Sequence, residues 1–166
     1  MLIFVYGTLL KGLENSHLLQ GSTFKFSAIT VDSFFMISNE NNGIPSANTY
    51  EPSEQLDAQV EKYPYPYLMK SGVNPSHTAS QIIGEVYEVS DEVLQKLDVL
   101  EDHPATYLRQ PVKVLPTSDI DEEVPEGVIE GYVLESSVVV EDIKANMQTG
   151  RYQIVEGGSW MSHVKK

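Results

Sequence analysis

The chain has 166 residues, of which 41% are hydrophobic and 9% aromatic, as in a folded globular protein and unlike a disordered one. It carries 24 acidic residues against 11 lysines and arginines, and the net charge of −13 argues against non-specific binding to nucleic acid or to anionic membranes. Cysteine is absent, which excludes disulfides, thiolate zinc sites and a cysteine nucleophile.

The length suits one domain, and we expect a single domain over residues 1–166 with a surface excursion at about residues 51–80. No apolar run approaches the ~20 residues of a membrane helix. Met1–Val5 leads directly into a strand-like segment, without the basic region and apolar core of a signal peptide. The expectation is therefore a soluble cytoplasmic protein that spans no membrane and binds no nucleic acid.

The first predicted element is a buried strand at Leu2–Val5, a short continuous apolar run. It leads into Tyr6, Gly7, Thr8 and Leu9. A buried strand that ends in a glycine-bearing turn presents successive backbone N–H groups at one edge, and such a nest binds anions or oxyanions. An ordinary strand-to-loop turn has the same composition, so these residues leave both interpretations open.

Two further strands are predicted at Thr23–Val31 and Ser33–Ser38, separated by Asp32. Glu51–Pro66 is polar with prolines near its ends, and we expect it to form the first part of the surface excursion. Tyrosines alternate with prolines where this segment ends, and they either line a pocket or pack at its rim. These tyrosines are Tyr63, Tyr65 and Tyr67.

The stretch Gly84–Arg109 predicts a strand, a short helix, an acidic corner and a second strand. Ser90 is suited to cap the helix, and the two acidic residues that follow it favour the helix dipole. Leucines then recur at helical spacing and mark the buried face of the helix. These leucines are Leu94, Leu97 and Leu100.

Glu101 is the most unusual residue of this stretch. It lies four residues after Leu97, so a continuing helix points it along the apolar stripe. A glutamate near a helix C-terminus opposes the dipole by about 0.3–1 kcal/mol, and lost hydration raises its pKa. Glu101 either pairs with Arg109 or His103 at the surface, or it is a desolvated carboxylate able to move protons near neutral pH.

The rest of the chain predicts a strand at Thr106–Leu115, a strand at Gly127–Leu134 and a helix at Ser136–Met147. Pro111 suggests that the first of these lies at a sheet edge or contains a bulge. Its alternation places Tyr107, Arg109 and Lys113 on one face, and Leu108, Val112 and Val114 on the other.

Common catalytic motifs are absent from the sequence. It has no Walker loop, no Gly-x-Gly-x-x-Gly run and no Gly-x-Ser-x-Gly elbow. Its histidines are scattered without metal-ligand spacing: His17, His77, His103 and His163. We expect no metal and no cofactor, and Glu101 remains the main chemical candidate.

Three separated blocks follow one another in the chain: Val5–Leu9 with Lys11, Gly12 and Asn15; Val31–Phe34 with Asn42–Pro45; and Gly84–Val89 with Leu97, Asp98, Glu101, Pro104, Tyr107 and Arg109. In this order they resemble the γ-glutamylcyclotransferase-like (AIG2-like) family. The spacing of Pro104 and Tyr107 is most similar to that of the γ-glutamylamine cyclotransferases. The resemblance covers Met1 to about Pro45 and Gln81 to Leu134, while the chain after Leu134 departs from it.

The resemblance implies an α+β fold, a small mixed β-barrel flanked by a few short helices. It also implies release of a γ-glutamyl group as 5-oxoproline, without a cofactor. By the same analogy Glu101 is the catalytic acid/base, and the turn Tyr6–Leu9 binds a small γ-glutamyl substrate through backbone groups. Tyr107 and Arg109 are supporting residues. Arg109 either binds a substrate carboxylate, or only orients Glu101 or neutralises the acidic corner, and Tyr107 either packs over the pocket or hydrogen-bonds within it.

This chemistry is physically reasonable because the substrate supplies its own nucleophile. Its α-amine attacks its γ-carbonyl, and well-oriented intramolecular reactions gain roughly 7–11 kcal/mol. The leading expectation is a γ-glutamylamine cyclotransferase, acting for example on γ-glutamyl-ε-lysine. Alternatives are a cyclotransferase for γ-glutamyl amino acids or glutathione-like peptides, or a non-catalytic module that binds a γ-glutamyl ligand or a protein.

Overall fold

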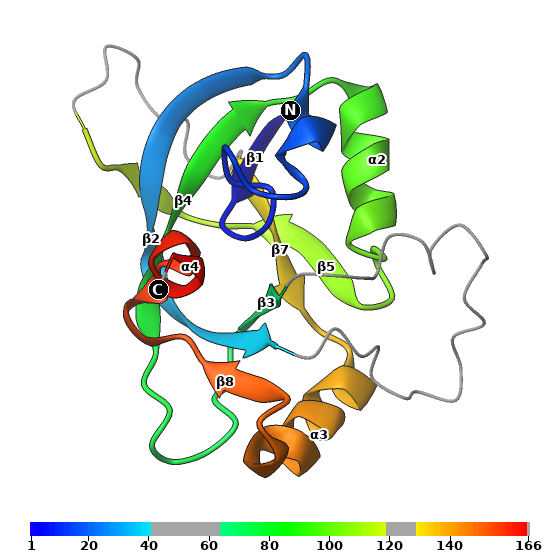
Figure 1. Ribbon diagram of the computed structural model, residues 1–166. Helices are drawn as coiled ribbons and strands as arrows, with labels where there is room; N and C mark the ends of the chain where they lie inside the picture. The colour runs from blue at the N-terminus through cyan, green and yellow to red at the C-terminus, as the bar shows by residue number, and fades with distance from the viewer. Residues whose placement is uncertain (41–63, 119–128, 166) are drawn as a thin grey trace.

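The computed structural model describes residues 1–40, 64–118 and 129–165 (Figure 1). In chain order the elements are β1 (Leu2–Val5), the 3-10 helix η1 (Ser16–Leu19), β2 (Thr23–Asn39), β3 (Tyr65–Met69), β4 (Ser80–Glu88), α2 (Asp91–Leu100), β5 (Tyr107–Pro111), β6 (Val114–Pro116), β7 (Ile129–Leu134), α3 (Ser137–Asn146), η2 (Met147–Thr149), β8 (Tyr152–Ile154), η3 (Glu156–Gly158) and α4 (Trp160–Val164). None of the helices in these described ranges is long and apolar enough to cross a membrane.

The strands form one mixed sheet in the order β3-β2-β4-β1-β7-β5, with β6 and β8 also paired to β2. The pair β1–β7 is parallel, and the other ladders are antiparallel. The sheet curls so that its two end strands approach each other, and the hydroxyl of Tyr107 on β5 donates to the carbonyl of Pro66 on β3 at 2.9 Å. A mixed, barrel-like sheet with a few short helices confirms the expected α+β class.

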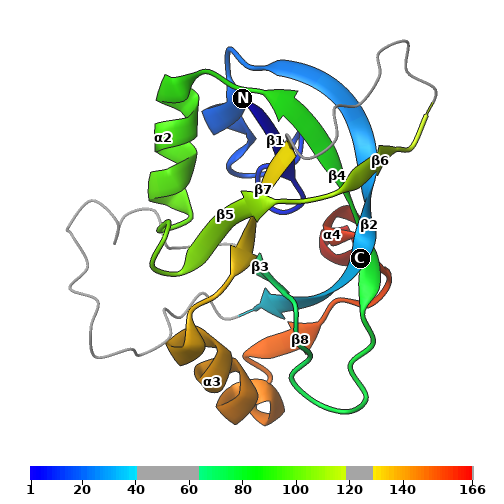
Figure 2. The ribbon, with the colours of Figure 1, turned by 180° about the vertical axis from the view of Figure 1, so that it is seen from behind.

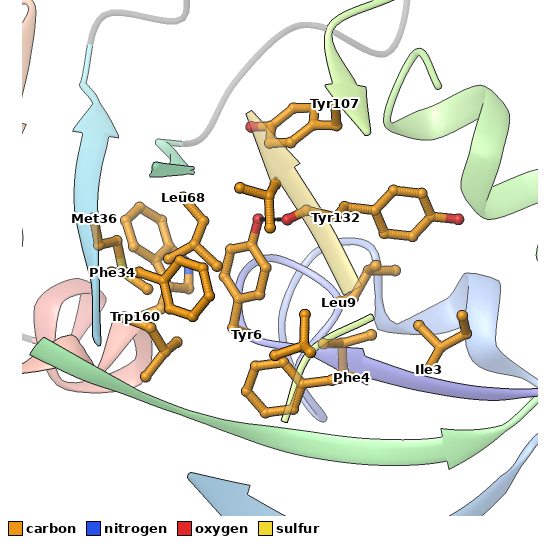
Figure 3. Close-up of a cluster of buried hydrophobic side chains, with 14 of the residues drawn as sticks. Ile3, Phe4, Tyr6, Leu9, Phe34, Met36, Leu68, Tyr107, Tyr132 and Trp160 are labelled. Atoms are coloured by element: carbon orange, nitrogen blue, oxygen red, sulfur yellow. Dashed lines mark hydrogen bonds between the residues drawn. The ribbon is translucent and has the colours of Figure 1, made fainter. Parts of the chain in front are cut away.

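Both ribbon views place α2 on the side of β5 and β7, and α3 beside β8 (Figures 1 and 2). The core lies inside the curl of the sheet. Figure 3 shows it as a cluster to which β1, β2, β3 and α4 all contribute; among its members are Phe4, Phe34, Met36, Leu68 and Trp160. Fully burying one such side chain stabilises the fold by about 1.5–3 kcal/mol.

The two strands expected at Thr23–Val31 and Ser33–Ser38 are one strand, β2, so the predicted break at Asp32 is wrong. The register of β2 against β4 shifts at this point, as in a bulge. The hydroxyl of Thr30 donates to the carbonyl of Asp32 at 2.6 Å and accepts from the backbone N–H of Ile82 at 2.8 Å. This side chain restores hydrogen bonds across the irregularity, and the strand continues.

The single strand expected at Thr106–Leu115 is in fact two, β5 and β6, because the chain leaves β7 after Pro111 and pairs next with β2. The edge position expected of Pro111 is confirmed, since β5 ends the sheet order. Tyr107 is 6% exposed and Leu108 is 37% exposed, so these two residues lie on opposite faces of β5, as the alternation predicts. Tyr107 can be buried because its hydroxyl has a partner in Pro66.

The surface excursion expected at about residues 51–80 requires a correction too. Tyr65–Met69 is β3, a strand that pairs with the end of β2 and is largely buried. This strand was not predicted, because neither tyrosine nor proline indicates a buried segment. Residues 51–63, with Tyr63, lie outside the described residues, as do the block Asn42–Pro45 and residues 119–128.

Candidate active site at Glu101

Helix α2 positions Glu101. The side chain of Ser90 caps the helix as predicted and accepts from the backbone N–H of Val93 at 3.3 Å. Leu97 is fully buried, whereas Leu94 is only partly buried and the stripe is completed by Val93. Glu101 is the residue that ends the helix, and its backbone N–H donates to the carbonyl of Leu97 at 2.9 Å.

The carboxyl group of Glu101 lies inside the protein, although the residue as a whole keeps some exposure to solvent. Burial raises its pKa from the ordinary 4.5 to about 8. Within residues 1–40, 64–118 and 129–165, no hydrogen bond or ion pair joins this carboxyl group to another side chain. The geometry therefore favours a desolvated carboxylate over a surface ion pair.

Arg109 is engaged elsewhere. Its Nε lies 3.0 Å from Oδ1 of Asp98, and its Nη1 lies 2.8 Å from Oε2 of Glu130. The hydroxyl of Tyr132 also donates to Oδ1 of Asp98, at 2.7 Å. His103 faces the backbone, with its Nδ1 accepting from the N–H of Arg109 at 3.2 Å. Arg109 thus joins helix α2 to strand β7 through ion pairs.

Three buried tyrosines lie within the electrostatic influence of the Glu101 carboxyl group. Burial and then the negative charge of Glu101 raise the pKa of Tyr6. Burial raises the pKa of Tyr107, with Tyr6 and Glu101 adding to the effect, and burial with the Asp98 contact and Glu101 does the same for Tyr132. All three hydroxyls therefore stay protonated donors near neutral pH.

Two of these hydroxyl groups hold the backbone beside the site in place through hydrogen bonds. Tyr6 donates to the backbone carbonyl of Tyr132 at 2.6 Å, drawn as a dashed line in Figure 3. Tyr107 donates to the carbonyl of Pro66 at 2.9 Å. Each hydrogen bond joins segments that are distant in sequence. The positions of Tyr6 and Tyr107 therefore depend on the backbone at Tyr132 and Pro66.

The turn that follows β1 lies next to Tyr6. The N–H of Leu10 donates to the carbonyl of Gly7 at 3.0 Å and closes the turn, while Asn15 bonds both the carbonyl and the hydroxyl of Thr8 at 3.0 Å. Among the residues described, the backbone N–H groups of Gly7, Thr8 and Leu9 have no acceptor. A row of such donors is the arrangement expected of an oxyanion nest.

Pro66 covers Gly7 closely. A Cβ added at Gly7 would lie 2.6 Å from Cγ of Pro66, a distance too short for any side chain. Glycine is therefore required here by the close approach of β3 to the turn. Tyr107 holds Pro66 in that position through the hydrogen bond to its carbonyl.

The structure thus gathers Tyr6, the turn Gly7–Leu9, Glu101 and Tyr107 in one region, and it leaves Arg109 paired with Asp98 and Glu130. Sequence reasoning missed Tyr132 and Pro66. Tyr132 stood inside an ordinary predicted strand, and Pro66 stood in a segment expected at the surface, so neither offered a local signal.

A half-open groove of about 380 Å³ lies elsewhere, lined in part by Lys11, Leu19, Phe24, Glu85 and Tyr87. None of the predicted site residues lines it. We place the site at Glu101 on chemical grounds, because burial raises the pKa of this carboxyl group to about 8. In the described part of the chain, no group of three or more His, Asp or Glu side chains is arranged to hold a metal ion.

Residues 3–162 match the family model described as "Gamma-glutamyl cyclotransferase, AIG2-like". Gamma-glutamylaminecyclotransferase A of Danio rerio is 29% identical to the chain over 112 residues, which are 68% of this chain and 57% of that protein. The match therefore spans less than two thirds of the length of this relative.

Solved structures show the same fold. The crystal structure of an AIG2-like protein from Mus musculus is 25% identical, with a TM-score of 0.53 over 82% of this chain and 77% of that one. An allophanate hydrolase from Kluyveromyces lactis matches 99% of this chain with 21% of its own, at a TM-score of 0.61 and 18% identity, which shows a shared fold alone.

Proposed function

The chain belongs to the gamma-glutamyl cyclotransferase, AIG2-like family, and on that premise we propose that it releases 5-oxoproline from a γ-glutamyl amine. One observation carries the proposal. Glu101 holds a buried carboxyl group whose pKa is raised to about 8, and no other group in the described residues neutralises it. A binding protein gains nothing from such a group, whereas a proton-transfer catalyst needs it.

Glu101 carries protons from the α-nitrogen of the substrate to the leaving nitrogen. In its ionised form it takes a proton from the α-ammonium, and the freed amine attacks the γ-carbonyl carbon. A carbon–nitrogen bond forms and closes the five-membered ring. Protonated Glu101 then gives this proton to the leaving nitrogen as the old carbon–nitrogen bond breaks, and the carboxylate so regenerated takes the second proton from the ring nitrogen and passes it to the amine, which departs as an ammonium. A pKa near the working pH suits both steps, and such catalysis contributes about 10²–10⁴-fold.

The backbone N–H groups of Gly7, Thr8 and Leu9 stabilise the tetrahedral oxyanion between these two steps. Fixed donors in a buried site need no reorganisation when the charge develops, and one such donor is worth roughly 10²–10³ in kcat. Tyr6 and Tyr107 act as positioning residues, since they hold the carbonyls of Tyr132 and Pro66.

The substrate we favour is a γ-glutamyl amine such as γ-glutamyl-ε-lysine. The name of the Danio rerio relative, gamma-glutamylaminecyclotransferase, supports this class. γ-Glutamyl amino acids and glutathione-like peptides undergo the same cyclisation and are the alternatives within this chemistry.

The test is to incubate the purified protein with γ-glutamyl-ε-lysine, γ-glutamyl-alanine and glutathione and to quantify 5-oxoproline. Glu101→Gln is nearly isosteric and should lose about 10²–10⁴-fold in kcat. Glu92→Gln is the matched control, because Glu92 lies exposed on the same helix and should leave turnover unchanged. Equal turnover in wild type and Glu101→Gln would contradict the assignment, and no turnover on any substrate would favour a binding module.

A further inference from the structure

Resting on the proposed function, we propose that Glu85 on β4 is a positioning residue for the turn that follows β1. Its backbone pairs with the chain just before the turn, and its carboxylate binds the chain just after the turn. Through these two contacts Glu85 holds in place the backbone N–H groups of Gly7, Thr8 and Leu9, which stabilise the tetrahedral oxyanion in the proposed reaction. Glu85 itself does not touch the substrate.

The backbone of Glu85 fixes the start of the turn. Glu85 lies opposite Val5 in the antiparallel ladder between β4 and β1, and Val5 is the last residue of β1. A Cβ added at the neighbouring Gly84 would collide with the carbonyl of Val5, so the two strands approach each other here more closely than a side chain would allow. The chain therefore enters the turn from a tightly packed strand pair.

The side chain of Glu85 fixes the end of the same turn. Its Oε2 accepts from the backbone N–H of Lys11 at 3.0 Å, across 74 positions of the sequence. The backbone bonds on either side of this contact, from Leu10 to Gly7 and from Leu13 to Leu10, stay within the segment itself. The contact with Lys11 therefore ties the end of the turn to β4, and an ionised acceptor makes such a hydrogen bond stronger than a neutral one does.

A turn that is held at both ends keeps its free donors in fixed directions. This matters for catalysis because an oxyanion hole works through donors that are aimed before the charge develops. A displacement of about 1 Å at a reacting centre can cost about 10²-fold in rate. Asn15 holds Thr8 in the middle of the turn, but it belongs to the same segment and would move with it. Only Glu85 relates the turn to the sheet through both of its ends.

The reach of the Glu85 side chain, and not its charge, is the property that the inference requires. Glu85→Gln keeps the length of the side chain and an amide oxygen that accepts from Lys11, so most of the wild-type kcat should remain. Glu85→Asp keeps the charge but is one methylene shorter, so the contact with Lys11 is lost. Its kcat for 5-oxoproline release should fall roughly 10–100-fold, with KM little changed. An electrostatic role of Glu85 would give the reverse order of the two variants and would overturn the inference.

Two neighbours on β4 provide matched controls. Glu88 lies exposed on the same strand, opposite Leu2 of β1, so Glu88→Ala removes the same charge without touching the turn and should leave kcat unchanged. The hydroxyl of Tyr87 is a second donor to Oε2 of Glu85, at 2.9 Å. Tyr87→Phe removes this donor and keeps the contact with Lys11, so kcat should again be unchanged. A loss in either control as large as that in Glu85→Asp would contradict the inference.

A double variant separates positioning of the turn from a general loss of stability. In Gly7→Ala the turn is already displaced by the collision with Pro66, so adding Glu85→Asp should lower kcat little further. Equal proportional losses in the wild-type and Gly7→Ala backgrounds would mean that Glu85 does not act through the turn.

The failure of the inference and the failure of the proposed function give different results. All variants are assayed with the one of the three γ-glutamyl substrates that wild type converts fastest. If wild type releases 5-oxoproline and Glu85→Asp has the same kcat, only the positioning role of Glu85 is wrong. If wild type releases no 5-oxoproline from any of the three, the proposed function fails and the inference falls with it.

Discussion

The burial of Glu101 has a cost to stability that can be measured separately from activity. Its folded-state pKa of about 8 lies above the ordinary 4.5, so between these values the folded protein binds more protons than the unfolded chain. The free energy of unfolding therefore falls as pH rises through this window. At ~1.4 kcal/mol per pKa unit, the loss is about 3 kcal/mol at pH 7.

Glu101→Gln should recover this loss, because the amide carries no charge. We expect the variant to be up to about 3 kcal/mol more stable than wild type at pH 7, with a much smaller difference near pH 4.5. Urea denaturation at several pH values measures the difference. Glu92→Gln on the exposed side of α2 should show no such pH dependence, and a pH-independent effect of Glu101→Gln would count against a buried, partnerless carboxyl group.

Gly7 provides a second residue-scale prediction. In Gly7→Ala the new Cβ would collide with Pro66, so either the turn or β3 must move. Overpacking of this kind costs about 1–3 kcal/mol, and the displaced N–H donors should lower kcat for 5-oxoproline release far more than they lower binding. Gly21→Ala is the control: its φ of +88° makes alanine strained, but no atom lies near the new Cβ, so it should destabilise without loss of kcat.

The parts of this site that could be predicted from the sequence are those whose pattern lies within a few neighbouring residues. Glu101 was found because a helix repeats every few residues, and an acid on the apolar stripe is visible within one turn. The turn Tyr6–Leu9 was found because a strand and a glycine are adjacent. Pro66 and Tyr132 reach the site through strand pairing over long separations, which no local pattern records.

At the scale of elements, Tyr107 joins the two ends of the sheet. It lies on β5, and its hydroxyl is bonded to Pro66 on β3. Tyr107→Phe should leave the buried carbonyl of Pro66 unsatisfied, at about 1–3 kcal/mol, and loosen the cover over Gly7, so both thermal stability and kcat should fall. The control is Tyr87→Phe, whose hydroxyl bonds Glu85 and lies away from the site. If kcat were unchanged in Tyr107→Phe, the positioning role would be wrong.

The predicted break at Asp32 is wrong because of a contact that lies far away in the sequence. The hydroxyl of Thr30 accepts from the backbone N–H of Ile82 and bridges the irregularity of β2. One hydrogen bond from a distant part of the chain thus outweighed local propensity. Helix α2 was predicted well because its cap and its apolar stripe lie within its own ten residues.

At the scale of the molecule, the short helix α4 is held by one large side chain. Trp160 is fully buried in the core, and five residues are too few for a helix to be stable alone. Trp160→Ala should cost about 3–5 kcal/mol, lowering the thermal midpoint and the yield of soluble protein. Lys165→Ala in the same terminal segment should have no such effect. If Trp160→Ala lowered the free energy of unfolding only slightly, α4 would contribute little to the stability of the core.

Strand β2 has a consequence for how the chain reaches its fold. It pairs with β3, β4, β6 and β8, whose residues are spread from Tyr65 to Ile154. Four strands must therefore find β2 across a long stretch of chain, so the contact order is high and folding should be slow. On a ribosome, β2 emerges long before β8, and its edge stays open until β8 has been made. Strand β2, which pairs with four other strands in the folded protein, is thus the strand most exposed to mispairing during synthesis.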